Sequence, residues 1–373
     1  MIYNDFHGKK LSALGLGCMR LPHTDSYADI DVNATRKMIA YAIENGINYF
    51  DTAWGYHGGN SEPIMGEILS EYTRDSFFLA TKFPGYDLEN FGKAEEIFEA
   101  QIKRCRVDYF DFYLFHSVTE KNIDSYLNPD FGTYEYLVAQ KKKGRIHHLG
   151  FSAHADVETM ERFINAFGEN IDFCQIQLNW LDYEFQDARA KVALLNKHGI
   201  PVWVMEPLRG GRLCKLSSEH EARLSALREG CSVTEWAFRF LESIPGVTLT
   251  LSGMSNFEQL EENIRIFSER KPLNEQEISL LLEFGREITA KNTLACTNCR
   301  YCTEHCPMNI DIPAVIKLYN KGVYSGGVSQ KAIEALDEGK RPTDCIGCAS
   351  CETVCPQAIK ISDMMAEISE QLK

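Results

Sequence analysis

Short apolar runs and amphipathic stretches alternate along most of this chain. The apolar runs are rich in β-branched and aromatic residues and have the length of strands, whereas the stretches between them carry apolar residues at helical spacing. The expected strands are 13–18, 49–53, 77–82, 110–116, 148–152, 173–178, 202–206 and 248–252, and the expected helices are 33–45, 62–72, 93–105, 131–143, 157–167, 184–198, 233–243 and 257–268. Repeated strand–helix units predict parallel pairing through crossover connections.

The number of these units predicts a closed barrel. Eight of them in about 270 residues match an α/β fold of the (β/α)₈ TIM-barrel type better than an open sheet. Residues 1–10 are expected to form a hairpin that closes the bottom of the barrel. After Pro272, Asn274 at the N-cap and Glu277 at the third helical position predict a helix to about residue 290. We therefore predict a barrel domain at 1–272 and, at 273–373, a helical linker with a small, mainly helical second domain.

Charge and hydropathy narrow the class of protein. The chain has 39 basic and 53 acidic residues and a formal net charge of −14, which argues against a nucleic-acid partner. It lacks the long apolar run of a membrane-spanning helix, and its start lacks the apolar segment of a secretory signal. We predict a cytoplasmic protein with neither a nucleic acid nor a membrane as its partner.

The cysteines gather near the end of the chain. Eight of the 13 lie between Cys296 and Cys355, in two runs at 296–307 and 345–356 that both read C-x₂-C-x₂-C-x₃-C-P. This is the ligand run of bacterial ferredoxins. A zinc site needs four ligands, normally as two pairs separated by a longer loop. We therefore predict two 4Fe–4S clusters, with a helical insert near 311–337 between the runs.

The spacing also predicts which cysteines share a cluster. In two-cluster ferredoxins the fourth cysteine of each run binds the other cluster. The first predicted set is Cys296, Cys299, Cys302 and Cys355, and the second is Cys345, Cys348, Cys351 and Cys306.

Polar residues at three successive strand ends indicate an acid–base site. Asp51 ends the second barrel strand with Tyr56 on the loop after it, Lys82 ends the third, and His116 ends the fourth. The carboxyl ends of barrel strands meet at one face, where barrel enzymes carry their chemistry. Asp51 can keep Lys82 charged, and the ammonium is expected to lower the pKa of Tyr56 toward neutrality. Tyr56 would then protonate a developing alkoxide while His116 hydrogen-bonds the same oxygen.

The motifs FDTAWGY, ATKFP and LFHS, in this order, resemble the aldo/keto reductase family. The resemblance covers about residues 1–270, and the whole chain is similar to the members that carry a C-terminal two-cluster ferredoxin domain. It implies an oxidoreductase that transfers a hydride between NAD(P)H and a small carbonyl or alcohol substrate. The coenzyme contacts that it implies are Gly17, Met19, Ser152, Gln177, Asn179, Met205, Leu208, Gly210, Gly211, Ser252, Gly253, Ser255, Gln259, Glu262 and Asn263.

The choice of coenzyme and the role of the clusters stay open. Met254 and Gln259 lie where NADP-preferring members of the family often have a cation, so both NADP and NAD are possible, with Arg265 as a substitute for the missing cation. One alternative is an electron-transfer module whose barrel docks a redox protein or a flavin. Another is a non-catalytic subunit with structural or oxygen-sensing clusters. A redox protein partner is a further possibility.

Overall fold

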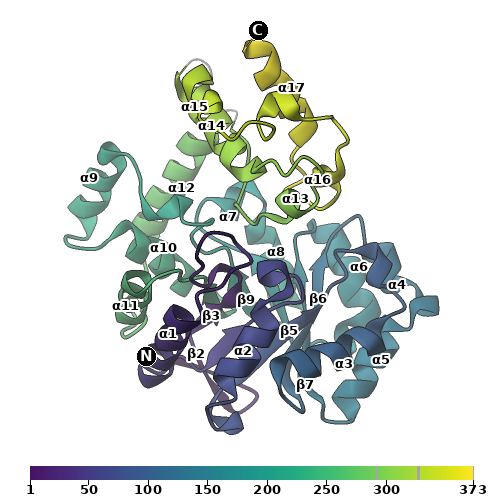
Figure 1. The fold of residues 1–373 in the computed structure, drawn as a ribbon. Helices are drawn as coiled ribbons and strands as arrows, with labels where there is room; N and C mark the ends of the chain where they lie inside the picture. The colour runs from purple at the N-terminus through teal and green to yellow at the C-terminus, as the bar shows by residue number, and fades with distance from the viewer. Residues whose placement is uncertain (291–292, 326–327, 373) are drawn as a thin grey trace. The chain divides into compact units, whose positions relative to one another are not determined.

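The computed structural model describes residues 1–290, 293–325 and 328–372 (Figure 1). Its contacts divide the chain into two compact units, Met1–Leu282 and Glu283–Lys373, which are described in turn. This division falls near the boundary predicted at 272/273, which stays a prediction. Among the described residues, no helix is both long enough and apolar enough to cross a membrane.

The first unit contains a closed parallel barrel in the order β10-β3-β4-β5-β6-β7-β8-β9. Its strands are β3 (Leu14–Gly17), β4 (Tyr49–Asp51), β5 (Phe78–Phe83), β6 (Phe110–Val118), β7 (Ile146–Ala153), β8 (Phe173–Gln177), β9 (Val202–Met205) and β10 (Val247–Ser252). Each predicted run overlaps one of these strands, so the (β/α)₈ prediction is confirmed. The apolar runs are continuous because parallel strands covered on both faces have no side exposed to water.

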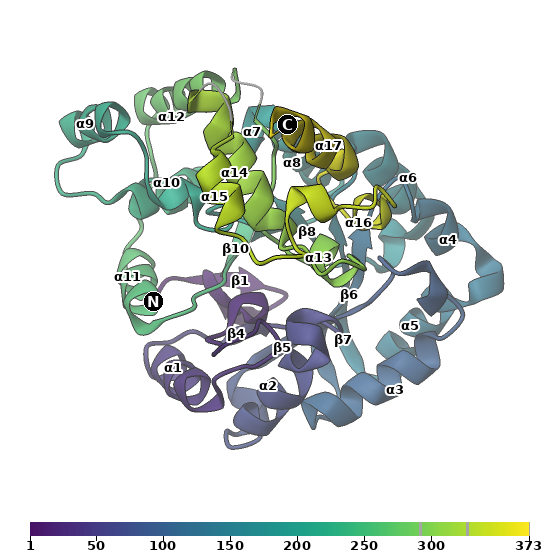
Figure 2. The same cartoon turned by 45° about the horizontal axis from the view of Figure 1, so that its top comes forward.

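Helices surround the barrel (Figure 2). Those that follow the strands as predicted are α1 (Val32–Glu44), α2 (Ser61–Leu69), α3 (Ala94–Cys105), α5 (Thr133–Lys142), α6 (Val157–Phe167), α8 (Ala188–Lys197), α10 (Val233–Glu242) and α11 (Phe257–Ile266). Two more helices, α4 (Ile123–Leu127) and α9 (Ser218–Leu227), lie in loops that the pattern did not resolve. The predicted helix 184–198 begins inside a separate short helix, α7 (Asp182–Phe185), that precedes α8.

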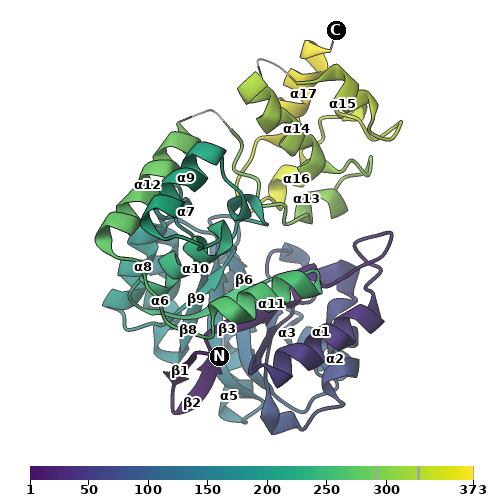
Figure 3. The ribbon, with the colours of Figure 1, turned by 90° about the vertical axis from the view of Figure 1, so that its left-hand side faces the viewer.

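An antiparallel hairpin, β1 (Tyr3–Phe6) and β2 (Lys9–Ser12), closes the end of the barrel where the strands begin (Figure 3). Its turn uses His7 and Gly8, both at positive φ (49° and 76°). Phe6 is buried among the aromatic rings of the barrel core, with its ring centre 4.9 Å from that of Trp203. The predicted hairpin is therefore confirmed, and Phe6 seals the bottom of the barrel.

Helix α12 (Glu275–Thr289) leads from the first unit into the second. Its start has the predicted cap: Asn274 Oδ1 accepts from the Glu277 amide at 3.0 Å, and a Glu277 carboxylate oxygen accepts from the Asn274 amide at 2.8 Å. These two bonds satisfy amides that have no partner inside the helix.

The second unit is helical around a small core. It contains α13 (Tyr301–Glu304), α14 (Ile312–Ser325), α15 (Gln330–Glu334), α16 (Ser350–Thr353) and α17 (Ile361–Gln371). Its core includes Ile316, Ile361 and Met365 together with the cysteines Cys302 and Cys351. The thiols thus belong to the same apolar cluster that holds the helices together.

Candidate active site

Lys82 and Asp51 form a buried ion pair at the carboxyl ends of β5 and β4. Lys82 Nζ donates to Asp51 Oδ1 at 2.6 Å and to the carbonyl oxygen of Thr52 at 2.7 Å. The Lys82 side chain is 0% exposed and that of Asp51 is 3% exposed. A buried ammonium is stable only when such partners replace its water. The pair therefore keeps a positive charge at a fixed place inside the barrel mouth.

Tyr56 lies beside this charge, at the start of the turn Tyr56–Gly59. Its hydroxyl oxygen is 3.4 Å from Lys82 Nζ, so the predicted neighbours are brought together. The next residue, His57, is buried at positive φ (54°) and joins two stretches of the N-terminal loop. Its Nε2 accepts from the Leu21 amide at 3.1 Å, so its Nδ1 carries the proton and donates to the carbonyl of Tyr27 at 2.5 Å. His57 thereby holds the backbone next to Tyr56 in place.

A bulge in β6 positions His116. The pairing of β6 with β7 shifts register between Phe115 and Val118, and Ser117 lies at positive φ (57°). The Ser117 amide donates to Ser152 Oγ at 2.8 Å, which fixes the bulge. Bulges of this kind redirect a side chain. The His116 ring lies edge-on to the Tyr56 ring, with 6.1 Å between the ring centres.

Burial sets the protonation states of His116 and Tyr56. It lowers the pKa of His116 well below its usual value, with Lys82 adding to the effect, so the imidazole is neutral at pH 7. Its Nδ1 is buried and has no hydrogen-bond partner within the described residues. Burial, followed by the Asp51 carboxylate, raises the pKa of Tyr56 well above its usual value. The expected lowering of the Tyr56 pKa is therefore wrong: Asp51 offsets the charge of Lys82, and Tyr56 stays a protonated phenol.

Two of the predicted coenzyme contacts, Gln177 and Asn179, are engaged by the buried carboxylate of Asp182. The Gln177 amide donates to Asp182 Oδ2 at 2.7 Å, and the Asn179 amide donates to the same oxygen at 2.6 Å. Asn179 Oδ1 also accepts from the amides of Leu181 and Asp182, and Arg209 Nε binds the carboxylate from the loop after β9. Both side chains thus help to hold the loops after β8 and β9.

Gln175, which the sequence analysis did not select, lies two residues earlier on the same face of β8. Its side-chain oxygen is buried and has no hydrogen-bond partner within the described residues, while its amide nitrogen contacts Met205 Sδ at 3.6 Å. A buried oxygen without a hydrogen bond lowers the stability of the fold, and a bound molecule that donates a hydrogen bond to it removes this cost. Gln175 therefore has a free hydrogen-bond acceptor next to Met205.

The remaining predicted coenzyme contacts lie near the carboxyl ends of β3, β9 and β10. Leu208, Gly210 and Gly211 form a turn after β9, with both glycines at positive φ, whereas Gly17 ends β3 and Met19 lies in the turn after it. Beyond β10, Gln259 Oε1 accepts from the Ser255 amide, Asn263 donates to Ser252 Oγ, and Glu262 accepts from Ser232. A Cβ on Gly253 would approach the side chain of Arg20 to 3.0 Å, so this close passage favours glycine.

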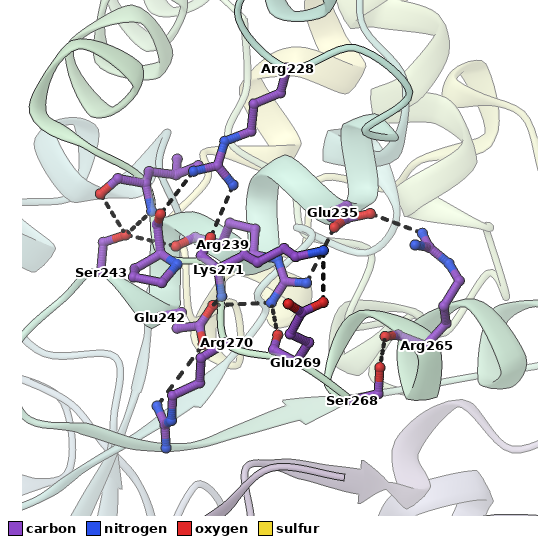
Figure 4. Close-up of polar contacts among 12 residues, drawn as sticks. Arg228, Glu235, Arg239, Glu242, Ser243, Arg265, Ser268, Glu269, Arg270 and Lys271 are labelled. Atoms are coloured by element: carbon purple, nitrogen blue, oxygen red, sulfur yellow. Dashed lines mark hydrogen bonds and ion pairs between the residues drawn. The ribbon is translucent and has the colours of Figure 1, made fainter.

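Arg265 does not reach toward these loops. Its guanidinium donates to Glu235 at 2.9 Å, in the polar network around α10 that also includes Arg239 and Glu242 (Figure 4). The aliphatic part of the Arg20 side chain lies beside Gly253, and its guanidinium is 3.9 Å from Glu206. Met254 is 1% exposed and carries no charge.

In the second unit, the eight cysteines border two cavities. One is lined by Cys296, Cys299, Cys302 and Cys355, and the other by Cys306, Cys345, Cys348 and Cys351. Among these described cysteines, no three have sulfur atoms that all lie within 4.8 Å of one another. Four thiolates on one zinc at ~2.3 Å would lie only about 4 Å apart. The wider spacing fits a larger inorganic core better than a single ion.

Comparisons with known proteins agree with this geometry. A model of the Aldo/keto reductase family matches residues 13–285, and a model of a 4Fe-4S dicluster domain matches residues 295–359. An uncharacterised oxidoreductase of Bacillus subtilis is 29% identical over 304 residues, which cover 73% of this chain and 92% of that protein. The NADH-specific methylglyoxal reductase of Escherichia coli is 26% identical over 299 residues, covering 68% of this chain and 89% of its own.

Solved structures show the same barrel. A thermostable aldo-keto reductase in complex with the inhibitor epalrestat superimposes with a TM-score of 0.63 at 23% identity, covering 76% of this chain and 99% of that chain. An aldo/keto reductase from Klebsiella pneumoniae in complex with NADP and acetate gives a TM-score of 0.57 at 21% identity, covering 74% of this chain and 93% of that chain.

Proposed function

This chain belongs to the aldo/keto reductase family, whose model matches most of its length, and we propose that its barrel reduces a small carbonyl compound at Asp51, Tyr56, Lys82 and His116. An NAD(P)-dependent oxidoreductase, as predicted from the sequence, is confirmed at the level of the family. The observation that carries the proposed site is the contact of a buried ammonium with a buried phenol, Lys82 Nζ to Tyr56 Oη at 3.4 Å.

In this proposal Tyr56 is the proton donor. The raised pKa of Tyr56 keeps its hydroxyl protonated at neutral pH, so a proton is always available. As a carbonyl oxygen gains negative charge, the Lys82 ammonium stabilises the phenolate left behind, because that charge is pre-positioned in a site of low dielectric. The neutral His116 orients the same oxygen through a hydrogen bond. Asp51 keeps Lys82 charged and in place.

The coenzyme is proposed to bind across β8 and β9. A nicotinamide bound there supplies the hydride. Gln175 would accept from its carboxamide, which satisfies the buried oxygen described above, and Met205 would pack beside the ring. The proposed carboxamide contact is therefore Gln175 rather than Gln177, which the family resemblance implies as a coenzyme contact. The loops that carry Ser252, Gly253 and Ser255 are proposed to hold the adenosine end.

We propose that this site accepts both NADPH and NADH. Met254 and Gln259 carry no positive charge for a 2′-phosphate: Met254 is buried, and Gln259 accepts a hydrogen bond from the Ser255 amide. The positive charge of Arg265 is paired with Glu235. Among the relatives, one is named as NADH-specific and another was solved with NADP. A thousandfold preference for NADPH in measured Kd values would contradict this proposal and would favour Arg20 as the phosphate contact.

The second unit is proposed to hold two 4Fe–4S clusters with the crossed ligand sets predicted from the sequence. The support is the lining of the two cavities, each of which combines three cysteines of one run with the fourth cysteine of the other. Iron bound to these thiols supplies one-electron redox chemistry. Quantification of iron and acid-labile sulfide should give about eight of each per chain.

An anaerobic assay tests the activity. Oxidation of NADPH and NADH is followed at 340 nm with a panel of small aldehydes and ketones, with Tyr56→Phe as the matched control. We expect carbonyl-dependent oxidation that the variant loses. If no carbonyl accelerates oxidation of either coenzyme in iron-replete protein, the proposed reaction is wrong.

A further inference from the structure

Two histidines and an aspartate meet at the end of the barrel opposite to Tyr56. His7 lies in the turn between β1 and β2, His148 lies near the start of β7, and Asp172 directly precedes β8. One ligand atom from each lies within 4.8 Å of the other two. Within the described residues, this is the one group of three histidine, cysteine or acidic side chains that gather so closely. Three separate segments of the first unit thus each contribute one side chain to this cluster.

The two imidazoles have a spacing that suits a shared ion. Their ring centres are 5.3 Å apart, with an angle of 27° between the planes. Two imidazoles that bind one tetrahedral ion at ~2.0 Å place their ring centres about 5 Å apart. His148 also packs against the rings of Phe6 and Phe112, at 4.9 and 5.0 Å, which limits its rotation. The barrel core therefore pre-orients this imidazole.

His148 is a neutral base that faces a carboxylate. Burial lowers the pKa of His148 to about 4, while Asp172 opposes this shift. Its Nδ1 lies 3.8 Å from Asp172 Oδ2, which is too far for a direct hydrogen bond. A neutral imidazole is the form that binds a metal ion, so at pH 7 no proton needs to be displaced.

The positive charge of Lys141 disfavours binding of a cation to His7, His148 and Asp172. Its ammonium donates to Asp172 Oδ2 at 2.6 Å, and the Leu149 amide donates to the same oxygen at 2.9 Å. These bonds hold the carboxylate in place, but the positive charge of Lys141 repels a metal ion within a few ångströms. The net result is a geometrically organised site with reduced affinity.

We propose that His7, His148 and Asp172 bind one divalent cation of the zinc class, and that Lys141 limits its affinity. Two imidazoles and one carboxylate are a donor set that suits Zn²⁺, with water as the fourth ligand. Because His7 belongs to the hairpin and the other two ligands to the barrel, the ion ties the hairpin across the bottom of the barrel. Binding to the folded state alone raises the thermal stability of the first unit.

The test is a calorimetric titration of iron-replete protein with ZnCl₂ under anaerobic conditions, combined with zinc K-edge X-ray absorption. We expect one saturable site with nitrogen and oxygen neighbours at ~2.0 Å, whereas zinc bound to cysteines would show sulfur at ~2.3 Å. The protein's melting temperature should rise with the zinc concentration. Absence of saturable binding, or a sulfur shell, overturns the proposal.

Variants distinguish this site from other zinc-binding surfaces. His148→Phe preserves the aromatic packing and His7→Gly preserves the positive φ, so both should fold, and His148→Phe should weaken binding by at least ~100-fold. His147→Phe is the matched control, because His147 stacks on Tyr109 and faces Asp111 instead. Circular dichroism and iron content verify that each variant folds. Equal affinity in His148→Phe and the wild type overturns the site.

The role of Lys141 has its own readout. Removing its ammonium in Lys141→Met should tighten zinc binding by roughly tenfold, since the repulsion disappears. A purely structural ion pair would instead give unchanged or weaker binding. That result overturns the part of the proposal that concerns Lys141.

Discussion

The barrel and the C-terminal unit bury their functional groups in opposite ways. In the barrel, the Lys82 ammonium meets Asp51 and a backbone carbonyl, so the protein itself balances the charge at the site. In the C-terminal unit, burial and neighbouring thiols raise the pKa of Cys302. Thiolates in such surroundings become stable when a metal takes up their charge. The charge in the barrel site is therefore balanced by groups of the chain itself, whereas the C-terminal site is completed by its inorganic groups.

This difference extends to stability. Large aromatic side chains from several strands fill the barrel core. The smaller core of the second unit includes two of the proposed cluster ligands, Cys302 and Cys351. We therefore expect changes in the barrel to affect catalysis without loss of iron, and changes in the cysteines to affect iron and local folding without loss of the barrel site.

The largest expected effect comes from Lys82→Met. It should lower kcat by roughly 10³-fold, since the phenolate of Tyr56 loses its stabilising charge. It also leaves the buried Asp51 carboxylate unpaired, which should cost about 3–5 kcal/mol of stability. Steady-state kinetics and denaturant unfolding measure these two losses, and the iron content should stay unchanged. A loss of iron would show that the two units are coupled.

Tyr56→Phe should separate chemistry from stability. We expect kcat to fall by ~10²-fold or more, because the proton donor is lost, while the Kd for the coenzyme and the unfolding midpoint change little. Reduction of the clusters by dithionite should be unaffected. Turnover close to that of the wild type would show that Tyr56 is not the proton donor.

Cys355→Ala tests the cluster ligands of the C-terminal unit. The crossed ligand sets predict that it removes the cluster of the 296–302 run, with the same electron paramagnetic resonance signature as Cys299→Ala. Cys214→Ala, which changes an exposed cysteine outside both runs, is the control and should keep all iron. Barrel activity should fall by less than about threefold, because Cys355 belongs to a different compact unit from the barrel residues. Loss of the 345–351 cluster alone would show that the ligands are not crossed.

Gln175→Leu and Gln177→Leu form a matched pair on one strand. Removing the acceptor in Gln175 should raise the Kd for the coenzyme by roughly tenfold, the value of one hydrogen bond to a ligand. Gln177→Leu should act mainly on stability, because it takes one donor from the buried Asp182. Fluorescence titration with NADPH and thermal unfolding distinguish the two. A larger effect on binding from Gln177 would support the contact predicted from the sequence.

The smallest expected effect concerns pH. Burial lowers the pKa of His57 to about 4, below the usual ~6.5 of an unfolded histidine. Because the unfolded chain then binds more protons, the stability that neutral His57 contributes is complete above about pH 6.5 and is lost as the pH falls toward 4. Melting curves of the wild type and His57→Gln at several pH values measure this contribution. An identical pH slope in both proteins would exclude it.

Local sequence patterns were sufficient for the framework of the molecule. The alternation of apolar runs and amphipathic stretches predicted the barrel and its helices, since both periods are set by backbone geometry. The cap at Asn274 and Glu277 was predictable because its bonds span only three residues. The cysteine runs predicted the clusters for a similar reason: the ligands of each run are close in sequence.

Other features depended on contacts between distant parts of the chain. Gln175 and Gln177 are two residues apart and share one face of β8, so periodicity cannot distinguish them. Asp182 makes the difference, because its carboxylate accepts from Gln177 and leaves the oxygen of Gln175 for another partner. The five-residue helix α4 was missed because so short a helix is stabilised by tertiary packing rather than by its own pattern. The ten-residue helix α9 was missed because it buries only Leu224 and so has no apolar stripe.

By itself, the sequence determined the fold class, the polar residues at the strand ends that we propose as the acid–base set, and the spacing of the proposed cluster ligands, because each depends on local spacing and on known strand geometry. The tertiary structure alone decided the raised pKa of Tyr56, the engagement of Gln177 and the meeting of His7, His148 and Asp172. Burial and electrostatic fields come from every element that packs around a group, and residues far apart in the chain become neighbours only when the barrel closes.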